Sequence, residues 1–267
     1  GGSTSGGGQA VDRFPRVRRL GHLLHKLTPV AAVLGLALSL LHQSSLGATY
    51  GVLSGRAIWF KPSLPVMFII SAVAGGTALT LLATLVVGKL IGQKPISDDL
   101  KHAMARITGF SLLAYIYLKL WDWAATSYYA NSPGTAEALA RLQATSLYHQ
   151  TFWWVEVLLA GVVPAVILLV SRFRRNDRLL LMALVLIVVG VVINRWNVTL
   201  SGLVAPPQWS PGVLGSVVAA AYFPFPVEVA VSLGILGYAL LAFTLGVRYL
   251  PLFPEEEWHA DDADLAD

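Results

Sequence analysis

The sequence predicts an all-α protein, a polytopic bundle of about six membrane-spanning helices with both termini in the cytoplasm. First, the 267 residues are 55% hydrophobic and 13% charged, and a charged share this far below the roughly 25% of soluble domains excludes water-soluble folds. Second, six mostly apolar stretches reach the length of about 20 residues that crosses a bilayer. Third, lysine and arginine are distributed unequally among the loops between these stretches.

The chain divides into three segments. Residues 1–16 begin with the run GGSTSGGG, which is typical of a flexible linker and lacks the apolar core of a signal peptide. Residues 17–252 form the predicted membrane domain. Residues 253–267 form an acidic tail, which we expect to be solvated. The predicted spans within the membrane domain are about 28–48, 64–88, 107–127, 151–171, 179–200 and 227–247.

The stretch 203–226 is also uncharged and long enough to cross a membrane, but it contains five prolines. Proline removes a backbone donor and interrupts a helix. We therefore expect an interfacial or protein-covered loop with a short helix at about 212–221, in preference to a seventh span.

The basic residues orient the bundle. Fourteen lysines and arginines lie in the N-terminal flank, the second and fourth loops and the C-terminal flank, whereas the other three loops hold Arg56, Lys61 and Arg141. Cytoplasmic loops carry the excess of lysine and arginine, so both termini are predicted to be cytoplasmic. The basic character of the chain is thus a sign of topology, and we expect no nucleic-acid partner.

A few ionisable residues lie inside the predicted spans: His42, Lys119, Asp122, Glu156 and Arg195. At about 1.5 Å per residue, they all fall roughly 8–12 Å below the outer edge of the membrane. Such residues are expensive in lipid and commonly functional. The sequence therefore predicts a layer of polar residues near the outer side, with Asn194 and Asn197 alongside.

Within this layer, Lys119 and Asp122 are three residues apart and can pair on one helical face. Glu156 and Arg195 lie on consecutive helices and can pair across their interface. Two interpretations fit these pairs: a lattice of salt bridges that sets helix packing, or a network that handles protons beside a ligand.

His42 begins a polar run, His42-Gln43-Ser44-Ser45, at the end of an otherwise apolar span. One interpretation is that His42 and Gln43 simply cap a helix end at the interface. A haem held by paired histidines is disfavoured, because His42 is the only histidine inside a predicted span. The chain also has no cysteine, so it offers no ligands for a cysteine-bound iron–sulfur cluster.

Several motifs, in order and spacing, resemble the polysulfide reductase NrfD family of membrane subunits, in particular its HybB-like branch. The motifs lie between about residues 17 and 254: Leu41-His42-Gln43-Ser44-Ser45-Leu46-Gly47, Lys119-Leu120-Trp121-Asp122, Phe152-Trp153-Trp154-Val155-Glu156, Arg174-Arg175-Asn176-Asp177-Arg178, Asn194-Arg195-Trp196-Asn197 and Tyr222-Phe223-Pro224 followed by Glu228. The resemblance covers the later part of the family fold. Chains of that branch have further spans ahead of the helix that ends in His-Gln-Ser-Ser.

The resemblance implies a haem-free subunit of the bacterial inner membrane that exchanges electrons between quinone or quinol and a periplasmic ferredoxin-like iron–sulfur partner. A catalytic or cytochrome subunit would lie beyond that partner. The further helices of the family fold would come from a separate membrane chain or from an earlier part of the same polypeptide, ahead of these 267 residues. Proton movement accompanies this exchange in some complexes. On this hypothesis His42, Lys119, Asp122, Glu156 and Arg195 form a proton or charge network, and His42, Gln43 and Ser44 border a quinone. A purely structural anchor and an ion or proton transporter are the alternatives.

Overall fold

The computed structural model describes residues 15–92, 96–128, 136, 139–140, 142–143, 146–204 and 225–249. All regular structure in these ranges is helical, which confirms the predicted fold class. The helices are α2 (Pro15–Gly51), α3 (Ser63–Ile91), α4 (Asp98–Tyr128), α6 (Ser146–Gln150), the π-helix η1 (Thr151–Val162), α7 (Val163–Leu169), α8 (Ser171–Arg174), α9 (Asp177–Val204) and α10 (Pro226–Tyr249).

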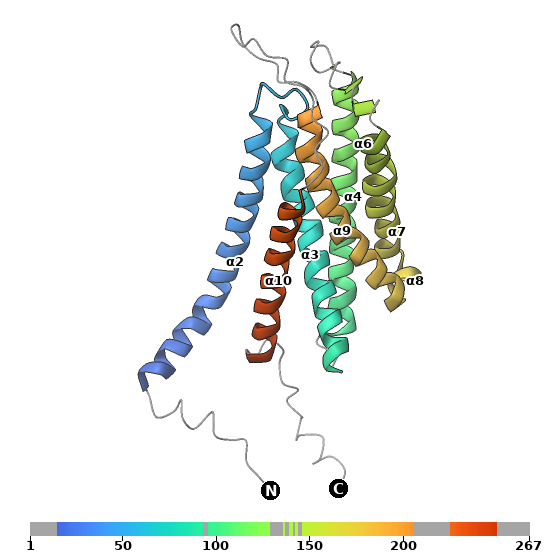
Figure 1. The fold of residues 1–267 in the computed structure, drawn as a ribbon. Coiled ribbons are helices and arrows are strands. Elements are labelled where there is room, and N and C mark those ends of the chain that lie inside the picture. The colour runs from blue at the N-terminus through green and yellow to red at the C-terminus, as the bar shows by residue number, and fades with distance from the viewer. Residues whose placement is uncertain are drawn as a thin grey trace.

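Within the described ranges, five stretches are long and apolar enough to cross a membrane: Leu27–Gly51, Ser63–Leu90, Tyr148–Leu169, Asp177–Leu203 and Pro226–Arg248. They coincide with five of the six predicted spans. The remaining predicted span, 107–127, lies within α4, a 31-residue helix whose composition is less apolar. This helix carries Lys119 and Asp122, and it packs along α3 over much of its length (Figure 1).

The helices alternate in direction, so that the beginning of α2 and the end of α10 lie at the same end of the molecule (Figure 1). This is the end to which the basic residues assign the cytoplasm, and we call it the cytoplasmic end; the opposite end, where α4 and α9 finish, is called the outer end. The proline-rich stretch 205–224, with its expected short helix, lies outside the described residues, as do residues 1–14 and 250–267.

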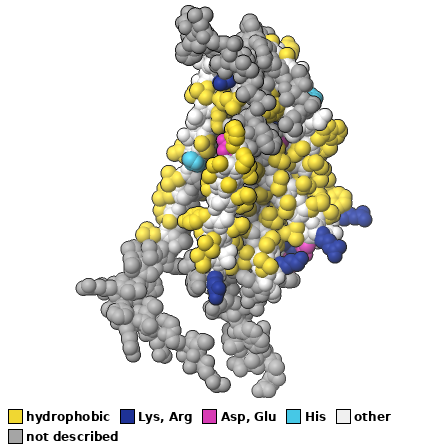
Figure 2. Space-filling model, in the orientation of Figure 1, with side chains coloured by type: hydrophobic (Ala, Val, Ile, Leu, Met, Phe, Trp, Pro, Cys, Tyr) yellow, Lys and Arg dark blue, Asp and Glu magenta, His cyan; other side chains and the backbone are white. Residues whose placement is uncertain are grey.

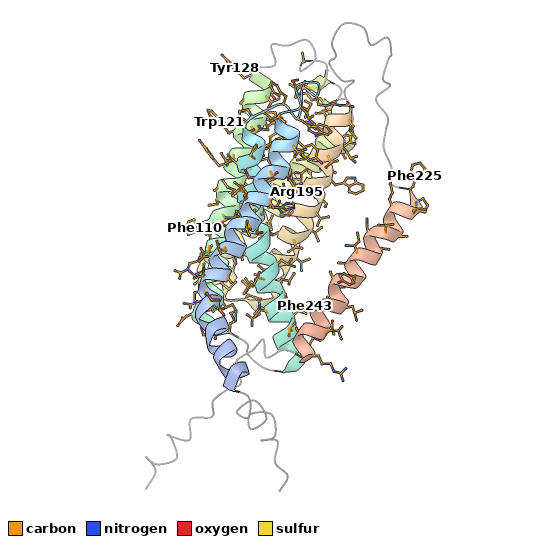
Figure 3. The ribbon with its side chains drawn as sticks, turned by 90° about the vertical axis from the view of Figure 1, so that its left-hand side faces the viewer. Phe110, Trp121, Tyr128, Arg195, Phe225 and Phe243 are labelled. Carbon is orange, nitrogen blue, oxygen red and sulfur yellow. The ribbon has the colours of Figure 1, made fainter. Side chains whose placement is uncertain are left out.

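A bundle of α3, α4, η1–α7 and α9 forms the centre of the structure, and α2 packs along α3. At Gly47 of α2, an added Cβ would lie 2.7 Å from the Cα of Pro65, so only glycine allows this approach. By contrast, α10 buries none of its apolar window and stands apart from the bundle in side view (Figure 3).

The tightly packed core occupies the cytoplasmic half of the bundle. Its fully buried side chains include Leu81, Leu168, Leu180, Leu184 and Ile187. Small residues such as Ala74, Ala78, Ala105 and Ala183 let the helix backbones approach one another. The outer half is packed differently, because polar side chains and a cavity replace the apolar contacts there.

Candidate functional site

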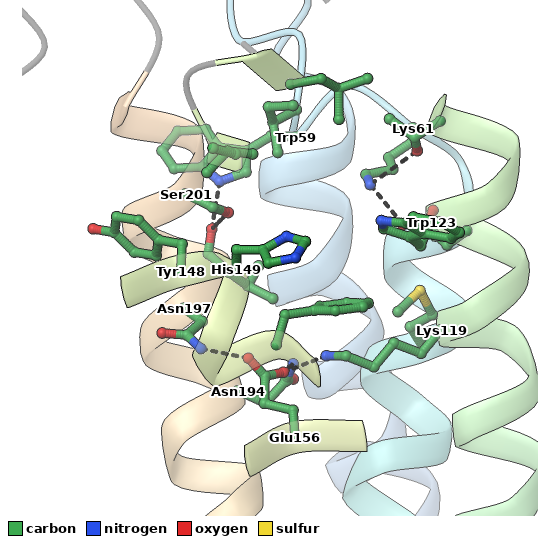
Figure 4. Close-up of a pocket in the computed structure, with 18 of the residues that line it drawn as sticks. Trp59, Lys61, Lys119, Trp123, Tyr148, His149, Glu156, Asn194, Asn197 and Ser201 are labelled. Atoms are coloured by element: carbon green, nitrogen blue, oxygen red, sulfur yellow. Dashed lines mark hydrogen bonds and ion pairs between the residues drawn. The ribbon is translucent and has the colours of Figure 1, made fainter. Parts of the chain in front are cut away.

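A cavity lies in the outer half of the bundle between α3, α4, η1 and α9, and the loop before α3 borders it (Figure 4). Its open space, including its mouth, measures about 980 Å³. Most of its wall is apolar or aromatic, and the polar groups are concentrated at its floor and mouth. The aromatic side chains that line it are Trp59, Trp123, Tyr148, Phe152 and Trp153. A concave, largely apolar site with a few convergent polar groups is typical of a ligand-binding site.

Glu156 is the centre of the cavity floor. Its carboxylate accepts hydrogen bonds from Lys119 Nζ and Asn194 Nδ2 on one oxygen and from Asn197 Nδ2 on the other (Figure 4). Lys119, Glu156 and Asn194 are each 5% exposed. The ammonium group of Lys119 also lies 5.1 Å from the ring centroid of Phe152 and 3.4 Å from Tyr115 Oη. Both charges are therefore paired and hydrogen-bonded, as buried ions require.

The helix that carries Glu156 is unusual. Residues Thr151–Val162 form a π-helix, a rare form that occurs mostly as single turns and often at functional sites. Pro164, two residues after the end of the π-helix, cannot donate a backbone hydrogen bond. This segment directs Glu156 into the bundle, where α9 supplies both asparagines.

A second ion pair lies at the cavity mouth. Lys61 Nζ is 2.6 Å from Asp122 Oδ2 and 3.4 Å from Thr126 Oγ1, and Ser63 Oγ donates to Asp122 Oδ1 at 2.5 Å. This pair is less buried than the floor pair, with side chains 19% and 14% exposed. It ties the loop before α3 to α4.

The pairings expected from the sequence are wrong. Asp122 pairs with Lys61, and Lys119 pairs with Glu156, so Lys119 and Asp122 do not form a pair with each other. The two residues share one face of α4, but Lys119 reaches down to η1 while Asp122 meets the loop above. Spacing along one helix could not reveal this, because each partner comes from another segment.

Arg195 belongs to a separate contact set. Although it follows Asn194 directly, its guanidinium group lies 3.6 Å from the ring centroid of Phe68 and donates to Phe68 O (3.2 Å), Ser71 Oγ (2.8 Å) and Gln43 Oε1 (3.4 Å). No carboxylate lies within ion-pair distance of it in the described part of the chain. The expected Glu156–Arg195 pair is thus also wrong, because successive residues on α9 point in different directions.

The polar run on α2 is split in the same way. Gln43 turns inward to Arg195 and Ser44 is partly buried, whereas His42 is exposed. His42 therefore does not join Lys119, Asp122 and Glu156 at the cavity. The structure places three of the five predicted network residues at one cavity and two outside it.

A smaller cavity lies beneath the floor, and its lining includes Ser71, Tyr115, Glu156 and Asn194. Ser71 also accepts the hydrogen bond from Arg195, so this space separates the two contact sets. Farther toward the cytoplasmic end, Thr108 Oγ1 donates to Thr77 Oγ1 at 2.9 Å within the apolar core. A discontinuous series of polar groups thus runs inward from Glu156.

Sequence reasoning missed Lys61, Ser71 and the Thr77–Thr108 pair. Lys61 lies in a predicted loop outside the spans, and isolated serines and threonines in apolar helices commonly bond to their own backbone. The useful signal was the pair Asn194 and Asn197, three residues apart and directed at one carboxylate. Among the described residues, no group of three or more histidine or acidic side chains could hold a metal ion.

Chemically, the cavity offers an acid–base group with access from the outer end. Glu156 can accept a proton only if its donors adjust, because Lys119, Asn194 and Asn197 all stabilise the carboxylate. A proton arriving at Glu156 would leave Lys119 as an uncompensated cation. The arrangement therefore couples any protonation of Glu156 to the charge of its neighbours.

A family model, polysulphide reductase NrfD, matches residues 9–207. The chain is 32% identical over 250 residues to the menaquinone reductase integral membrane subunit of Nitratidesulfovibrio vulgaris, which covers 90% of this chain and 57% of that protein. It is 24% identical over 242 residues to the Hdr-like menaquinol oxidoreductase integral membrane subunit of Archaeoglobus fulgidus, covering 87% of this chain and 60% of that protein.

A third relative is the probable Ni/Fe-hydrogenase 2 b-type cytochrome subunit of Escherichia coli, 26% identical over 238 residues, or 86% of this chain and 54% of that protein. The chain therefore spans somewhat more than half the length of these curated relatives. Comparison with solved structures gives no significant match.

Proposed function

The chain belongs to the polysulphide reductase NrfD family, and from that premise we propose that it is a membrane subunit of a quinone-linked oxidoreductase complex in which the Glu156 network handles protons. The observation that carries this proposal is the location of the buried Lys119–Glu156 pair at the floor of a cavity near the outer end. A buried ion pair is weak evidence for stability alone, because apolar contacts often stabilise equally well. Because the Lys119–Glu156 pair borders a cavity, exchange of protons with that cavity is a role that would account for these buried charges.

Quinone chemistry is supported by the relatives, two of which are called menaquinone reductase and menaquinol oxidoreductase membrane subunits. Oxidation of a quinol releases two electrons and two protons, so the subunit must dispose of both. We propose that quinol or quinone borders α2 at His42, with Gln43 and Ser44 beside it. His42 is exposed there, so further helices, from a separate membrane chain or from another part of the same polypeptide, would complete this site.

The two electrons must leave through a partner, because the chain has no cysteine to hold an iron–sulfur cluster. We propose a periplasmic ferredoxin-like iron–sulfur subunit at the outer end, and a catalytic or cytochrome subunit beyond it. Exposed aromatic side chains near this end, including Trp121, Tyr128 and Trp154, suit coverage by such a partner. The setting would be the bacterial inner membrane, and this chain would bind no haem.

In this mechanism the protons pass through groups of this chain. Arg195 and Ser71 separate the α2 side from the small inner cavity, and Glu156 lies between that cavity and the outer one. Glu156 would take up a proton from the inner side and release it to the outer cavity. Lys119 would hold the carboxylate ionised between these events. The Thr77–Thr108 pair extends the polar series toward the cytoplasmic end and is a candidate continuation of the path.

The test uses the complex purified with this chain in place and carrying Glu156→Gln. If Glu156 carries protons in a rate-determining step, the rate of quinol-dependent electron transfer should fall at least about tenfold, which agrees with the contribution of a positioned acid–base group. The rate of proton release should fall by the same factor. Asp122→Asn is the matched control, because it removes a carboxylate that lines the same cavity at its mouth.

A structural anchor predicts a different outcome. Both variants would then retain electron transfer and proton release per assembled complex, and Glu156→Gln would lower stability alone. A transporter predicts ion flux in proteoliposomes without any redox partner. Protection of the α2 region from labelling by a quinol analogue tests the His42 assignment separately; unchanged labelling during normal turnover would remove the quinone from this chain.

A further inference from the structure

The cytoplasmic end of the bundle carries a group of cations that quinone chemistry does not use. It lies where α8 joins α7 to α9, beside the start of α4, and Figure 2 shows lysine and arginine side chains gathered at the end of the molecule beside α8. We call these residues the basic cluster: Lys101, Arg106, Arg172, Arg174, Arg175 and Arg178.

The basic cluster is not neutralised within the described part of the chain. Lys101 pairs with Asp98 at 2.8 Å and with Asp177 at 3.2 Å. None of the five arginines has a carboxylate within 4.0 Å among the residues that the structure describes. The nearby acids are Asp98, Asp99 and Asp177, so the six cations of the basic cluster exceed them by three charges.

Arg174 is the unusual member, because its side chain is buried. It is 8% exposed, and its Nη1 donates to Leu168 O at 2.7 Å and Leu169 O at 3.2 Å, at the carbonyl end of α7. Its Nε is buried and has no hydrogen-bond partner among the residues that the structure describes. Leaving a buried donor unpaired costs free energy, more so on a charged group.

The electrostatics of the neighbours agree with an excess of positive charge. The pKa of Arg174 is lowered first by burial and then by the charges of Arg106 and Arg175. The pKa of His102 is lowered first by burial and then by Lys101 and Arg174. Both shifts oppose the protonated forms, and neighbouring cations contribute to each of them.

We propose that the basic cluster binds the phosphate head group of an anionic phospholipid from the cytoplasmic leaflet. Guanidinium groups match phosphate with two parallel hydrogen bonds, and clusters of cations at the cytoplasmic ends of membrane helices bind anionic head groups. A lipid fits better than a soluble phosphate, because the exposed apolar side chains of Val166, Val170 and Phe173 continue from the cluster along the bundle. These side chains would contact an acyl chain.

The experiment measures lipid binding to the full-length chain in detergent by native mass spectrometry, with phosphatidylglycerol, phosphatidylcholine and soluble glycerol phosphate as separate probes. We expect phosphatidylglycerol to bind more tightly than phosphatidylcholine. Arg106→Gln and Arg175→Gln should each weaken phosphatidylglycerol binding about fivefold, because one cation near an anionic surface contributes about that factor. Both side chains are exposed, so these variants should fold.

Lys89→Gln is the matched control, since Lys89 is an exposed cation in the last turn of α3, at the same end of the bundle. It should change binding less than twofold. If Lys89→Gln weakened phosphatidylglycerol binding as much as the cluster variants, binding would depend on surface charge in general, and the proposed site would be refuted. Equal binding of phosphatidylglycerol and phosphatidylcholine would also overturn the proposal. Displacement by glycerol phosphate at equal concentration would identify a soluble phosphate as the ligand instead. None of these outcomes depends on quinone chemistry.

Discussion

Removal of the charge of Glu156 is the sharpest test of the cavity floor. Glu156→Gln keeps the size and shape of the side chain but replaces one of two acceptor oxygens with a donor amide. Three donors converge on the carboxylate, from Lys119, Asn194 and Asn197. The glutamine can accept on its single oxygen only, so at least one donor loses its partner.

The larger cost comes from Lys119. Glu156→Gln leaves the buried ammonium group without a counter-charge, next to the neutral acceptors Tyr115 Oη at 3.4 Å and the glutamine oxygen and the faces of two aromatic rings. Breaking a buried pair by removing one partner costs about 3–5 kcal/mol. The double variant Glu156→Gln with Lys119→Met removes both charges, and we expect it to recover about half of that loss or more.

The measurement is the free energy of unfolding in mixed micelles, followed by tryptophan fluorescence. Asp122→Asn is the control, because its pair with Lys61 is partly exposed and should contribute about 1–2 kcal/mol. A loss below about 1 kcal/mol in Glu156→Gln, or a double variant no more stable than the single one, would refute a desolvated pair at the floor.

Three further predictions follow from the same structure. Gly190→Ala should destabilise the bundle by about 1–3 kcal/mol, because the added Cβ would collide with Ala160. Gly76→Ala should be nearly neutral in the same unfolding assay, because nothing lies within 4 Å of the added Cβ. Equal losses of stability in the two variants would contradict the close approach of α9 and η1. The pKa of His102 is lowered in the folded chain, first by burial and then by Lys101. The unfolded chain therefore binds a proton at His102 more readily than the folded chain. The stability that His102 contributes should be present above about pH 6.5 and should decline as the pH falls below that value. His102→Gln should reduce this acid sensitivity of the melting temperature, and an unchanged slope would exclude His102 as its source. Arg195→Gln should lower the free energy of unfolding by about 1–3 kcal/mol, because it removes the contacts to Ser71 and Phe68. Val192→Ala, on the exposed side of α9, should lower it less. Urea titration of the two variants measures this difference.

Much of the architecture could be predicted from the sequence, because bilayer thickness fixes the length of a spanning helix and the cost of charge in lipid makes each span conspicuous. The one predicted span that is not among the five most apolar stretches lies within α4, and this helix carries Lys119 and Asp122. A helix inside a bundle can keep such residues if its neighbours pair with them. The residues that weakened the span in sequence are the ones that the structure places at the cavity.

The partners of the charged residues could not be predicted from spacing. Periodicity assigns a side chain to a face of its own helix but leaves open what the other helices bring to that face. Lys61 came from a loop and the π-helix η1 redirected Glu156, and neither feature has a clear signature in the sequence. His42 illustrates the same limit: its depth was apparent, but its exposure depends on how α2 packs on α3.

The sequence by itself determined that this chain is a helical membrane protein of the NrfD family, with ionisable residues inside its predicted spans and without cysteine. Only the tertiary structure decided which charges meet, because ion pairs across helices depend on the rotation and approach of whole helices. It joined Lys119 to Glu156 and Lys61 to Asp122, and it left Arg195 among neutral acceptors and His42 exposed. The physical reason is that helix length and depth are set locally by hydrophobicity, whereas contacts between helices are set by the packing of the bundle.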